Sequence, residues 1–350
     1  MTVQQNSGRY LEDFRQGEII RHATPRTITS GDQALYTALY GSRFAVQSSA
    51  EFARGLGYAA MPVDDLLVFH IVFGKTVPDI SLNAVANLGY AECRWLQPVY
   101  AGDTLRATSE VIGVKENSNR QTGVVHVRSR GLNQRGEVVL DYVRWVMVRK
   151  RDAASQITPA LAPPLRSAVS PAELGGAVPK LNLAAYDDVL AGSAQRFDHY
   201  AVGSKIDHVD GMTVEEAEHQ LATRLYQNTA KVHFNQFAQA SDRFGRRLIY
   251  GGHVISLARA LSFNGLANGF HVAAINGGRH VSPLFAGGTV FAWSKVLDKQ
   301  RLAGRDDVGA LRLRTIATRD LTCVQFPEPG DAASEGQVLL DLDWWLLLPI

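Results

Sequence analysis

The stretch LYTALY at residues 35–40 recurs as LATRLY at residues 221–226, so that two leucines, a threonine and a tyrosine return in the same frame. Further matches at the same spacing of 186 residues pair Gly17, His22, Thr27 and Val46 with Gly203, His208, Thr213 and Val232. Self-similarity over this distance predicts two copies of one fold, joined head to tail.

Two later strings repeat in the same order. Residues 94–104 (RWLQPVYAGDT) match residues 279–289 (RHVSPLFAGGT), and GEVVLD at 136–141 matches GQVLLD at 336–341. Between the copies, five of the thirteen prolines fall within residues 153–183, which is typical of an extended linker because proline fixes φ and removes a donor. We therefore expect an N-terminal domain at 1–152, a linker at 153–183 and a C-terminal domain at 184–350.

Each copy carries one apolar stripe with helical spacing. The stripes consist of Leu66, Phe69, His70 and Phe73 in the first copy and of Val254, Leu257, Ala258 and Leu261 in the second. Strand-like stretches follow, at 104–114, 123–129 and 138–148 and at 289–297, 310–318 and 338–348. A long buried helix followed by antiparallel strands predicts an α+β double hot dog, in which each sheet wraps its helix. On this stripe His70 is interpreted as a core histidine.

Composition argues against several classes of protein. Hydrophobic residues make up 46% of the 350 and charged residues 20%, as in a globular protein, and a net charge of +2 gives no case for binding nucleic acid or a membrane surface. Neither a signal peptide nor a run long enough to span a bilayer is expected. Cys93 and Cys323 form no CxxC pair, which favours a reducing cytoplasm. With neither a cluster of ligands at metal spacing nor a dinucleotide fingerprint, we expect no metal and no cofactor.

The two copies differ where chemistry is expected. Alignment on the shared Leu-Tyr places His233 opposite Gln47 and Asn228 opposite Ser42. A histidine can exchange a proton near neutral pH and a glutamine cannot, so the difference favours a proton-transfer role for His233 over a structural one. The second copy is therefore predicted to be the catalytic one.

A second difference lies at the start of the helix. The first copy has Pro62-Val63-Asp64-Asp65 where the second has Tyr250-Gly251-Gly252-His253. Glycines entering a helix leave backbone N–H groups free to stabilise an enolate oxygen, although a tight turn that needs φ > 0 would also select glycine. His253 either lines the same pocket or is solvated.

The second half resembles the MaoC-like, R-specific enoyl-CoA hydratases, whose signature is Asp-x-Asn-Pro-x-His followed by a His-Gly helix entry. His233 falls on the motif histidine, Asn228 on the motif aspartate and Gly251-Gly252 on the His-Gly pair, whereas Ala230 and Lys231 replace the motif Asn and Pro. Over most of its length the chain is more similar to the mesaconyl-CoA (2-methylfumaryl-CoA) hydratase, or β-methylmalyl-CoA dehydratase, family. The segments that carry this resemblance are residues 34–50, 64–96 and 141–150.

This resemblance implies cofactor-free addition of water to a CoA thioester. His233 would act as base, and either Asn228 would orient the water or another acid would supply the second function of the motif. The N–H of Gly252 would stabilise the enolate, and Tyr250, Gly251 and His253 would line the substrate pocket. A free substrate carboxylate calls for a cation, for which Arg43, Arg94 and Arg279 are the candidates. The expected partners are the CoA thioester and a second copy of the chain, as a homodimer. Alternatives are a hydratase for other enoyl-CoA esters, a hot-dog thioesterase, and a non-catalytic acyl-CoA-binding protein.

Overall fold

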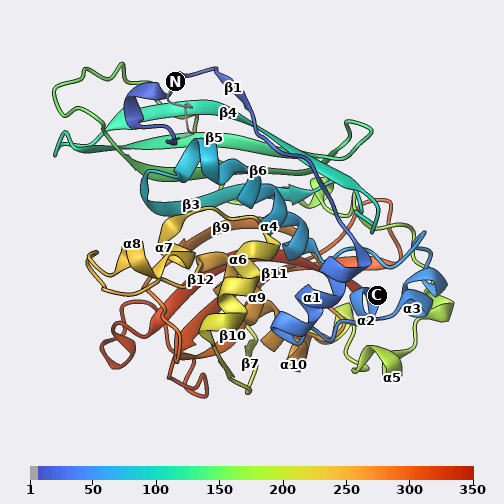
Figure 1. Ribbon diagram of the computed structural model, residues 1–350. Coiled ribbons are helices and arrows are strands. Elements are labelled where there is room, and N and C mark those ends of the chain that lie inside the picture. The colour runs from blue at the N-terminus through green and yellow to red at the C-terminus, as the bar shows by residue number, and fades with distance from the viewer. Residues whose placement is uncertain (1–6) are drawn as a thin grey trace.

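A computed structural model describes residues 7–350, in which one antiparallel sheet of twelve strands runs through both halves of the chain (Figure 1). Its order is β1-β4-β5-β6-β3-β9-β12-β11-β10-β7, with β2 paired to β4 and β8 to β10. The strands of the first half are β1 (Ile19–Arg21), β2 (Arg26–Thr27), β3 (Ala84–Trp95), β4 (Thr104–Glu116), β5 (Thr122–Leu132) and β6 (Val138–Arg149). Those of the second half are β7 (Lys205–Asp207), β8 (Met212–Thr213), β9 (His271–His280), β10 (Thr289–Arg301), β11 (Val308–Arg319) and β12 (Val338–Pro349).

Ten α-helices accompany this sheet within residues 7–350. They are α1 (Ser30–Tyr40), α2 (Ala45–Ser48), α3 (Ala50–Gly55), α4 (Asp65–Thr76), α5 (Asp188–Ala191), α6 (Glu216–Leu225), α7 (Lys231–Phe234), α8 (Gln236–Gln239), α9 (Gly251–Leu261) and α10 (Phe263–Leu266). None of the helices within residues 7–350 is long and apolar enough to cross a membrane.

The central helices α4 and α9 each pack into the curve of their own half-sheet (Figure 1). Asp64 caps α4 by accepting a hydrogen bond from the backbone N–H of Leu66 at 2.9 Å, and every residue from Leu66 to Thr76 is buried. Helix α9 is likewise buried from Gly252 to Leu261. The predicted α+β double hot dog is confirmed, and His70 is a core histidine.

The six predicted strands are present. Each half also has a fourth long strand, β3 or β9, which the sequence pattern did not predict, and these two strands join the halves. These two pair antiparallel, with Tyr90 opposite Gly278 and Arg94 opposite Ala274. Because both strands are central, they lack the alternation of apolar and polar residues that marks a half-exposed strand.

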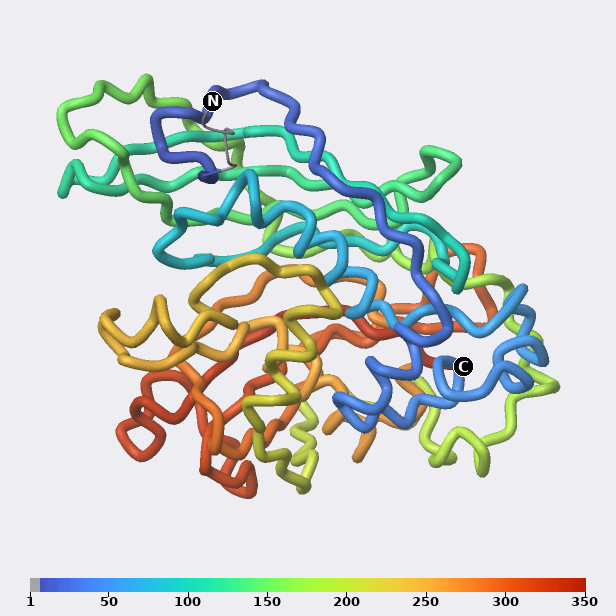
Figure 2. Tube along the Cα trace, in the orientation of Figure 1, coloured from blue at the N-terminus to red at the C-terminus, as the bar shows by residue number. Residues whose placement is uncertain are grey.

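Equivalent residues of the two halves make equivalent contacts, which gives the molecule an approximate twofold symmetry (Figure 2). Thr27 bonds Thr104 at 2.7 Å and Thr213 bonds Thr289 at 2.8 Å. On the symmetry axis the hydroxyl of Tyr40 meets that of its counterpart Tyr226 at 2.7 Å. The recurring tyrosine of the opening motif thus joins the two copies.

The proline-rich segment after β6 crosses the face of the second half-sheet opposite α9. Its buried side chains, which include Val169 and Leu181, pack with Phe270 and Trp345. The backbone N–H of Leu181 donates to the carboxylate of Asp307 at 2.6 Å. The segment is therefore extended and fastened to the sheet.

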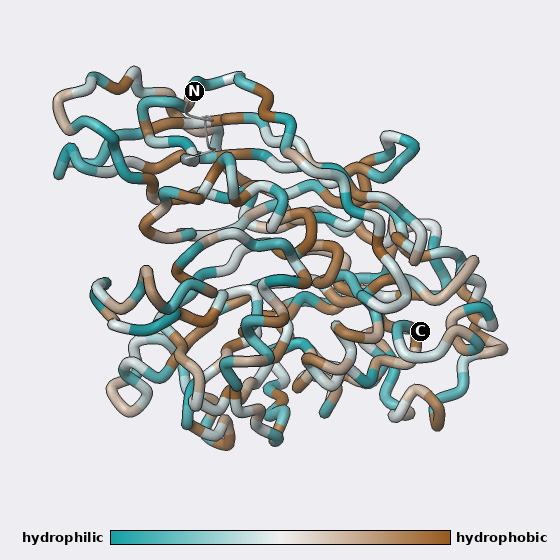
Figure 3. Tube along the Cα trace, viewed as in Figure 1, coloured by the Kyte–Doolittle hydropathy of each residue, from teal (hydrophilic) through white to brown (hydrophobic). Residues whose placement is uncertain are grey.

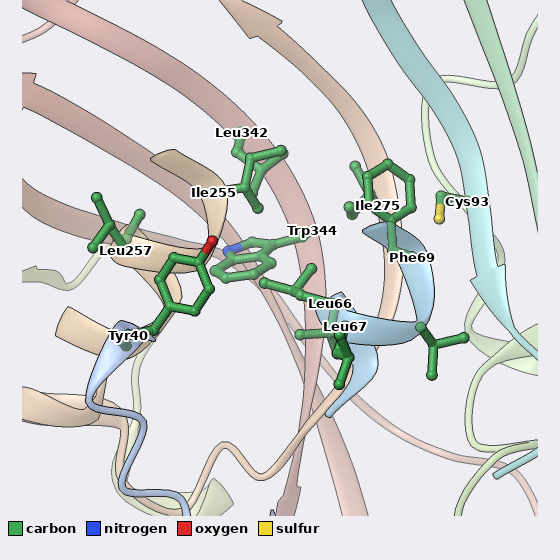
Figure 4. Packing of buried hydrophobic residues seen from close by; sticks show 14 of the residues in the cluster. Tyr40, Leu66, Leu67, Phe69, Cys93, Ile255, Leu257, Ile275, Leu342 and Trp344 are labelled. Atoms are coloured by element: carbon green, nitrogen blue, oxygen red, sulfur yellow. The ribbon is translucent and has the colours of Figure 1, made fainter. Parts of the chain in front are cut away.

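Apolar side chains of both halves form one core between the helices and the sheet. Figure 3 shows hydrophobic residues concentrated along α4 and the strands beneath it. In Figure 4, Leu66 and Phe69 of α4 lie close to Ile275 of β9 and Trp344 of β12. This continuous core holds the two halves in one arrangement, and a site built between them is equally fixed.

Candidate active site

A cavity of about 540 Å³ opens between the two halves. The second half contributes Asn228, Ala230–His233, Gln239, Asp242, Leu248–Gly251, Val254, His280–Leu284 and Leu339. The first half contributes Tyr10, Phe73, Val77, Ser81–Asn87, Tyr90, Arg144 and Arg149. The cavity therefore needs both copies, although the predicted motif lies in only one.

The motif loop presents Asn228 and His233 to this cavity. Asn228 is buried, and its Oδ1 accepts a hydrogen bond from the backbone N–H of Ala230 at 3.1 Å, which closes a tight turn before α7. The Nδ1 of His233 lies 2.9 Å from the carbonyl oxygen of Leu248. A carbonyl oxygen can only accept, so Nδ1 carries the proton and Nε2 keeps a free lone pair.

Burial lowers the pKa of His233 to about 4, against the opposing effect of its hydrogen bond to the Leu248 carbonyl. The imidazole is therefore neutral at pH 7, with an unprotonated Nε2, which is the state that a general base requires. The ring of Tyr250, which also lines the cavity, contacts His233 with its centroid at 5.4 Å.

The glycine pair at the start of α9 is required for close packing. Neither Gly251 nor Gly252 has a positive φ, so the alternative of a φ > 0 turn is wrong. A Cβ at Gly251 would overlap the ring of His280, and one at Gly252 would overlap the ring of Tyr250. Within the described residues neither backbone N–H has an acceptor, as expected in the first turn of a helix. Gly251 lines the cavity, whereas Gly252, the predicted enolate donor, is buried and does not line it.

The structure places His253 away from the cavity, and both expectations for it are wrong. It is 1% exposed, and its Nδ1 bonds the hydroxyl of Tyr40 at 2.7 Å. The neighbouring His219 accepts a hydrogen bond from the backbone N–H of Tyr250 at 2.8 Å. Burial lowers the pKa of His253 to about 3 and that of His219 to about 2. Both are neutral structural groups that hold the helix entry in place.

None of the three candidate arginines lines the cavity. Arg43 is exposed, and it bonds the side chain of Asn264 at 3.0 Å. Arg94 pairs with Asp141 at 3.1 Å and with Glu173, and Arg279 lies 3.4 Å from Asp341. Arg94 and Arg279 are counterparts in the repeat, as are their aspartates, so the repeat itself marks both pairs as structural. The proposal that any of these arginines holds a substrate carboxylate is not supported.

Two cavity residues escaped the sequence analysis, although both differ between the copies. Arg144 is fully buried, and its counterpart is Trp344. His280 faces Gly251, and its counterpart is Trp95. Burial, with a smaller contribution from His233, lowers the pKa of His280 to about 4. The signal that singled out His233, a polar residue in one copy only, also marks both of these residues.

At the equivalent place in the first half the space is filled. The cavity there is about 10 Å³ and is lined by Gln47, Val63 and Asp65, together with Ala177 of the linker and His271 of β9. Gln47 Nε2 donates to the carbonyl of Phe270 at 2.8 Å, and His271 pairs with Asp65 at 2.8 Å. This site has no room for an acyl chain.

Within residues 7–350, no three His, Cys, Asp or Glu side chains are grouped so that they could hold a metal ion. The two cysteines are free and buried.

The chain is similar to known proteins along its whole length. The family model for mesaconyl-CoA hydratase matches residues 2–324. The β-methylmalyl-CoA dehydratase of Chloroflexus aurantiacus is 57% identical over 351 residues, which cover 100% of this chain and 99% of the relative. The mesaconyl-CoA hydratase of Cereibacter sphaeroides is 60% identical over 345 residues, which cover 98% of this chain and 99% of the relative. A solved MaoC domain protein dehydratase from C. aurantiacus superposes with a TM-score of 0.96 at 57% identity, covering 99% of each chain. A Mycobacterium tuberculosis protein described as a double hot dog gives a TM-score of 0.72 at 23% identity, covering 99% of this chain and 100% of its own.

Proposed function

The chain belongs to the mesaconyl-CoA hydratase family, and we propose that it reversibly adds water across the double bond of mesaconyl-CoA (2-methylfumaryl-CoA) to give β-methylmalyl-CoA. The observation that carries this proposal is the setting of His233. Its Nδ1 is bonded to the Leu248 carbonyl, which leaves Nε2 unprotonated, and the residue lines a cavity large enough for an acyl thioester. The protein is accordingly a hydro-lyase.

In the forward reaction His233 Nε2 takes a proton from water as the oxygen bonds to the β-carbon of the substrate. The electron pair of the double bond moves toward the thioester, which becomes an enolate, and the α-carbon then takes up a proton. General-base assistance of this kind typically contributes about 10²–10⁴-fold. The net change is the addition of one water molecule, without metal or redox chemistry.

The remaining groups of the cavity fit supporting roles. The unpaired N–H groups at the start of α9 stabilise the enolate oxygen, and losing one such donor typically costs about 10²–10³-fold in rate. Asn228 lines the same cavity as His233, and its side chain, fixed by the hydrogen bond from Ala230, orients the water. The protonated His233 then holds the proton that the α-carbon takes up, and the neutral His280 lies in the same cavity.

Incubation of the purified protein with mesaconyl-CoA, with the products analysed by mass spectrometry, tests the proposal. We expect a gain of one water, together with loss of the enoyl absorbance. Release of free CoA thiol would instead identify a thioesterase. Hydration of crotonyl-CoA but not of mesaconyl-CoA would identify a different hydratase, and binding without either change would identify an acyl-CoA-binding protein.

A homo-oligomer and a cytoplasmic location stay predictions. The expectation of a dimer rested on exposed sheet edges, and the sheet ends at β1 and β7, which have three residues each. Such short edges need little cover, so any dimer contact must be sought elsewhere on the surface. A solution mass of 38.2 kDa by light scattering would contradict the oligomer.

A further inference from the structure

Arg144 lies on β6 with its side chain fully buried at the cavity wall. Its Nη2 donates to the Thr76 hydroxyl at 2.8 Å, the Ser81 hydroxyl lies 3.4 Å from both terminal nitrogens, and the guanidinium stacks over Phe73 with 4.2 Å to the ring centroid. Its Nε has no acceptor. Among residues 7–350, no carboxylate lies within salt-bridge distance of it.

A buried charge without a counter-charge is costly, and proteins pair such groups or place them where a ligand supplies the partner. Arg259, the other fully buried arginine with a lowered pKa, has Asp64 and Asp65 near enough to favour its charge. The groups that favour the charge of Arg144 are Tyr142, Tyr90 and Tyr250, which are neutral hydroxyls at pH 7. The missing anion must therefore come from outside the protein.

The repeat shows that the fold does not need an arginine here. The counterpart of Arg144 is Trp344, which is also fully buried in the equivalent strand β12 and appears among the core side chains in Figure 4. The equivalent position of the fold thus accepts a large neutral side chain. A cation occurs only in the copy whose strand faces the open cavity.

We propose that Arg144 binds the free carboxylate of the substrate and makes the site selective for CoA esters of dicarboxylic acids. This inference rests on the proposed function and deepens it. In mesaconyl-CoA the free carboxylate is attached to the β-carbon, which is the atom that water attacks. The unpaired Nε supplies one arm of a bidentate pair with that carboxylate.

The location of Arg144 agrees with this geometry. Tyr250 contacts His233 with ring centroids 5.4 Å apart, and it contacts Phe73, over which Arg144 stacks, at 5.6 Å. The base and the cation therefore line one cavity, with Tyr250 and Phe73 in contact between them. Arg144 neutralises the negative charge of a carboxylate held there while water attacks the neighbouring β-carbon.

Two unreactive esters test the inference without relying on turnover. Succinyl-CoA carries a free carboxylate where butyryl-CoA carries a methyl group, and neither has a double bond to hydrate. We expect the wild-type protein to bind succinyl-CoA more tightly. Arg144→Met should weaken succinyl-CoA binding by about 10- to 100-fold, as measured by calorimetry with freshly prepared ester, and should leave butyryl-CoA binding nearly unchanged.

The controls separate charge recognition from folding and from the proposed reaction. Arg149→Met removes an exposed cation at the same cavity and should change both affinities by the same factor. If Arg144→Met fails to fold, Arg144→Lys tests the inference instead. This variant keeps a positive charge and should therefore keep part of the preference for succinyl-CoA over butyryl-CoA. Equal weakening of both esters by either Arg144 variant overturns the inference. A preference that depends on Arg144 in a protein that does not hydrate mesaconyl-CoA would overturn the proposed function alone.

Discussion

The two halves of this molecule contain the same site twice, once open and once closed. The open site has a volume of about 540 Å³ and the closed one about 10 Å³. Each is built from the helix entry of one half and the first residues of the central strand of the other, at Ala84–Asn87 of β3 and at His271 of β9. The architecture is therefore shared, and the side chains decide which site can work.

Three of the exchanges that separate the sites change a base, a helix entry and a charge. The proposed base, His233, stands opposite the amide of Gln47, and Gly251 stands opposite Val63, whose side chain occupies space. The third exchange sets Arg144 against Trp344. Residues that recur in both halves, such as the tyrosine pair on the symmetry axis, maintain the fold. In a fused repeat, symmetry therefore identifies structural residues and its local loss identifies functional ones.

Replacing His233 is the most direct test of the difference between the open and the closed site. His233→Gln copies the residue of the closed site, and Gln47 already shows that a glutamine there can donate to a backbone carbonyl. The fold should stand while kcat/KM falls by about 10²–10⁴-fold, or roughly 3–5 kcal/mol. The residual rate measures what the remaining groups of the cavity supply. The reverse change, Gln47→His, should leave kcat/KM unaltered, and a His233→Gln enzyme that keeps more than about a tenth of it would refute the role of base.

Closing the open site should have the next largest effect. Gly251→Val introduces the side chain of Val63, and its Cβ would overlap the His280 ring. Displacement of reacting groups by about 1 Å can cost on the order of 10²-fold, so we expect kcat/KM to fall by about that factor with a modest loss of thermal stability. Val63→Gly is the matched control and should gain no activity, because Ala177 and the Asp65–His271 pair still fill that space. A Gly251→Val rate within threefold of wild type would show that the glycine is dispensable.

Residue types and their spacing were enough to predict part of the fold and part of the candidate site. Periodicity and the repeat predicted the two helices and six long strands, and the mismatch at His233 singled out the candidate base. The sequence analysis missed β3 and β9 because strands buried on both faces show no alternation. Residue type also misplaced His253, which lies next to the glycine pair in sequence but turns into the core to meet Tyr40.

The arginine candidates failed for a related reason. Three were chosen by their nearness to motifs, and two of them recur in both halves together with their aspartates. Arg144 lay at a position where the repeat has a buried tryptophan, so the alignment already contained the signal. Only the structure, however, shows that the charge is buried, unpaired and at the cavity wall.

The pH dependence of activity offers a smaller but sharper test of the open site. An exposed histidine would lose its free base near pH 6.5, whereas burial lowers the pKa of His233 to about 4. We expect kcat/KM to stay flat from pH 8 down past 6.5 and then to fall about tenfold per pH unit below about 4. A decline centred near pH 6.5 would mean that His233 is solvated in the free enzyme.

Stability must be measured alongside these rates. His219 and His253 are also held neutral by burial, so between pH 6.5 and their lowered pKa values the unfolded chain binds more protons than the folded one. The free energy of unfolding therefore decreases as pH falls through this window. Brief pH jumps into assay buffer, with activity recovered on return to pH 7, separate titration of the base from unfolding.

The smallest effect on kcat/KM is expected from Asn228→Asp. This change introduces into the open site the aspartate of the Asp-x-Asn-Pro-x-His motif found in MaoC-like hydratases. The new side chain can still accept the Ala230 N–H, so the turn should hold, and if Asn228 only orients water, kcat/KM at pH 7 should stay within about threefold of wild type. A carboxylate in the same cavity favours the protonated imidazole, so the acid limb of the pH profile should move above its wild-type position near 4.

Ser42→Asp, the counterpart in the closed site, should lower stability without shifting that limb, because the Ser42 hydroxyl is buried and unpaired. A rise of more than about tenfold in kcat/KM for Asn228→Asp would mean that the wild-type site lacks an acid it needs, whereas abolished activity would mean that the Asn228 NH₂ group is an essential donor to water or substrate.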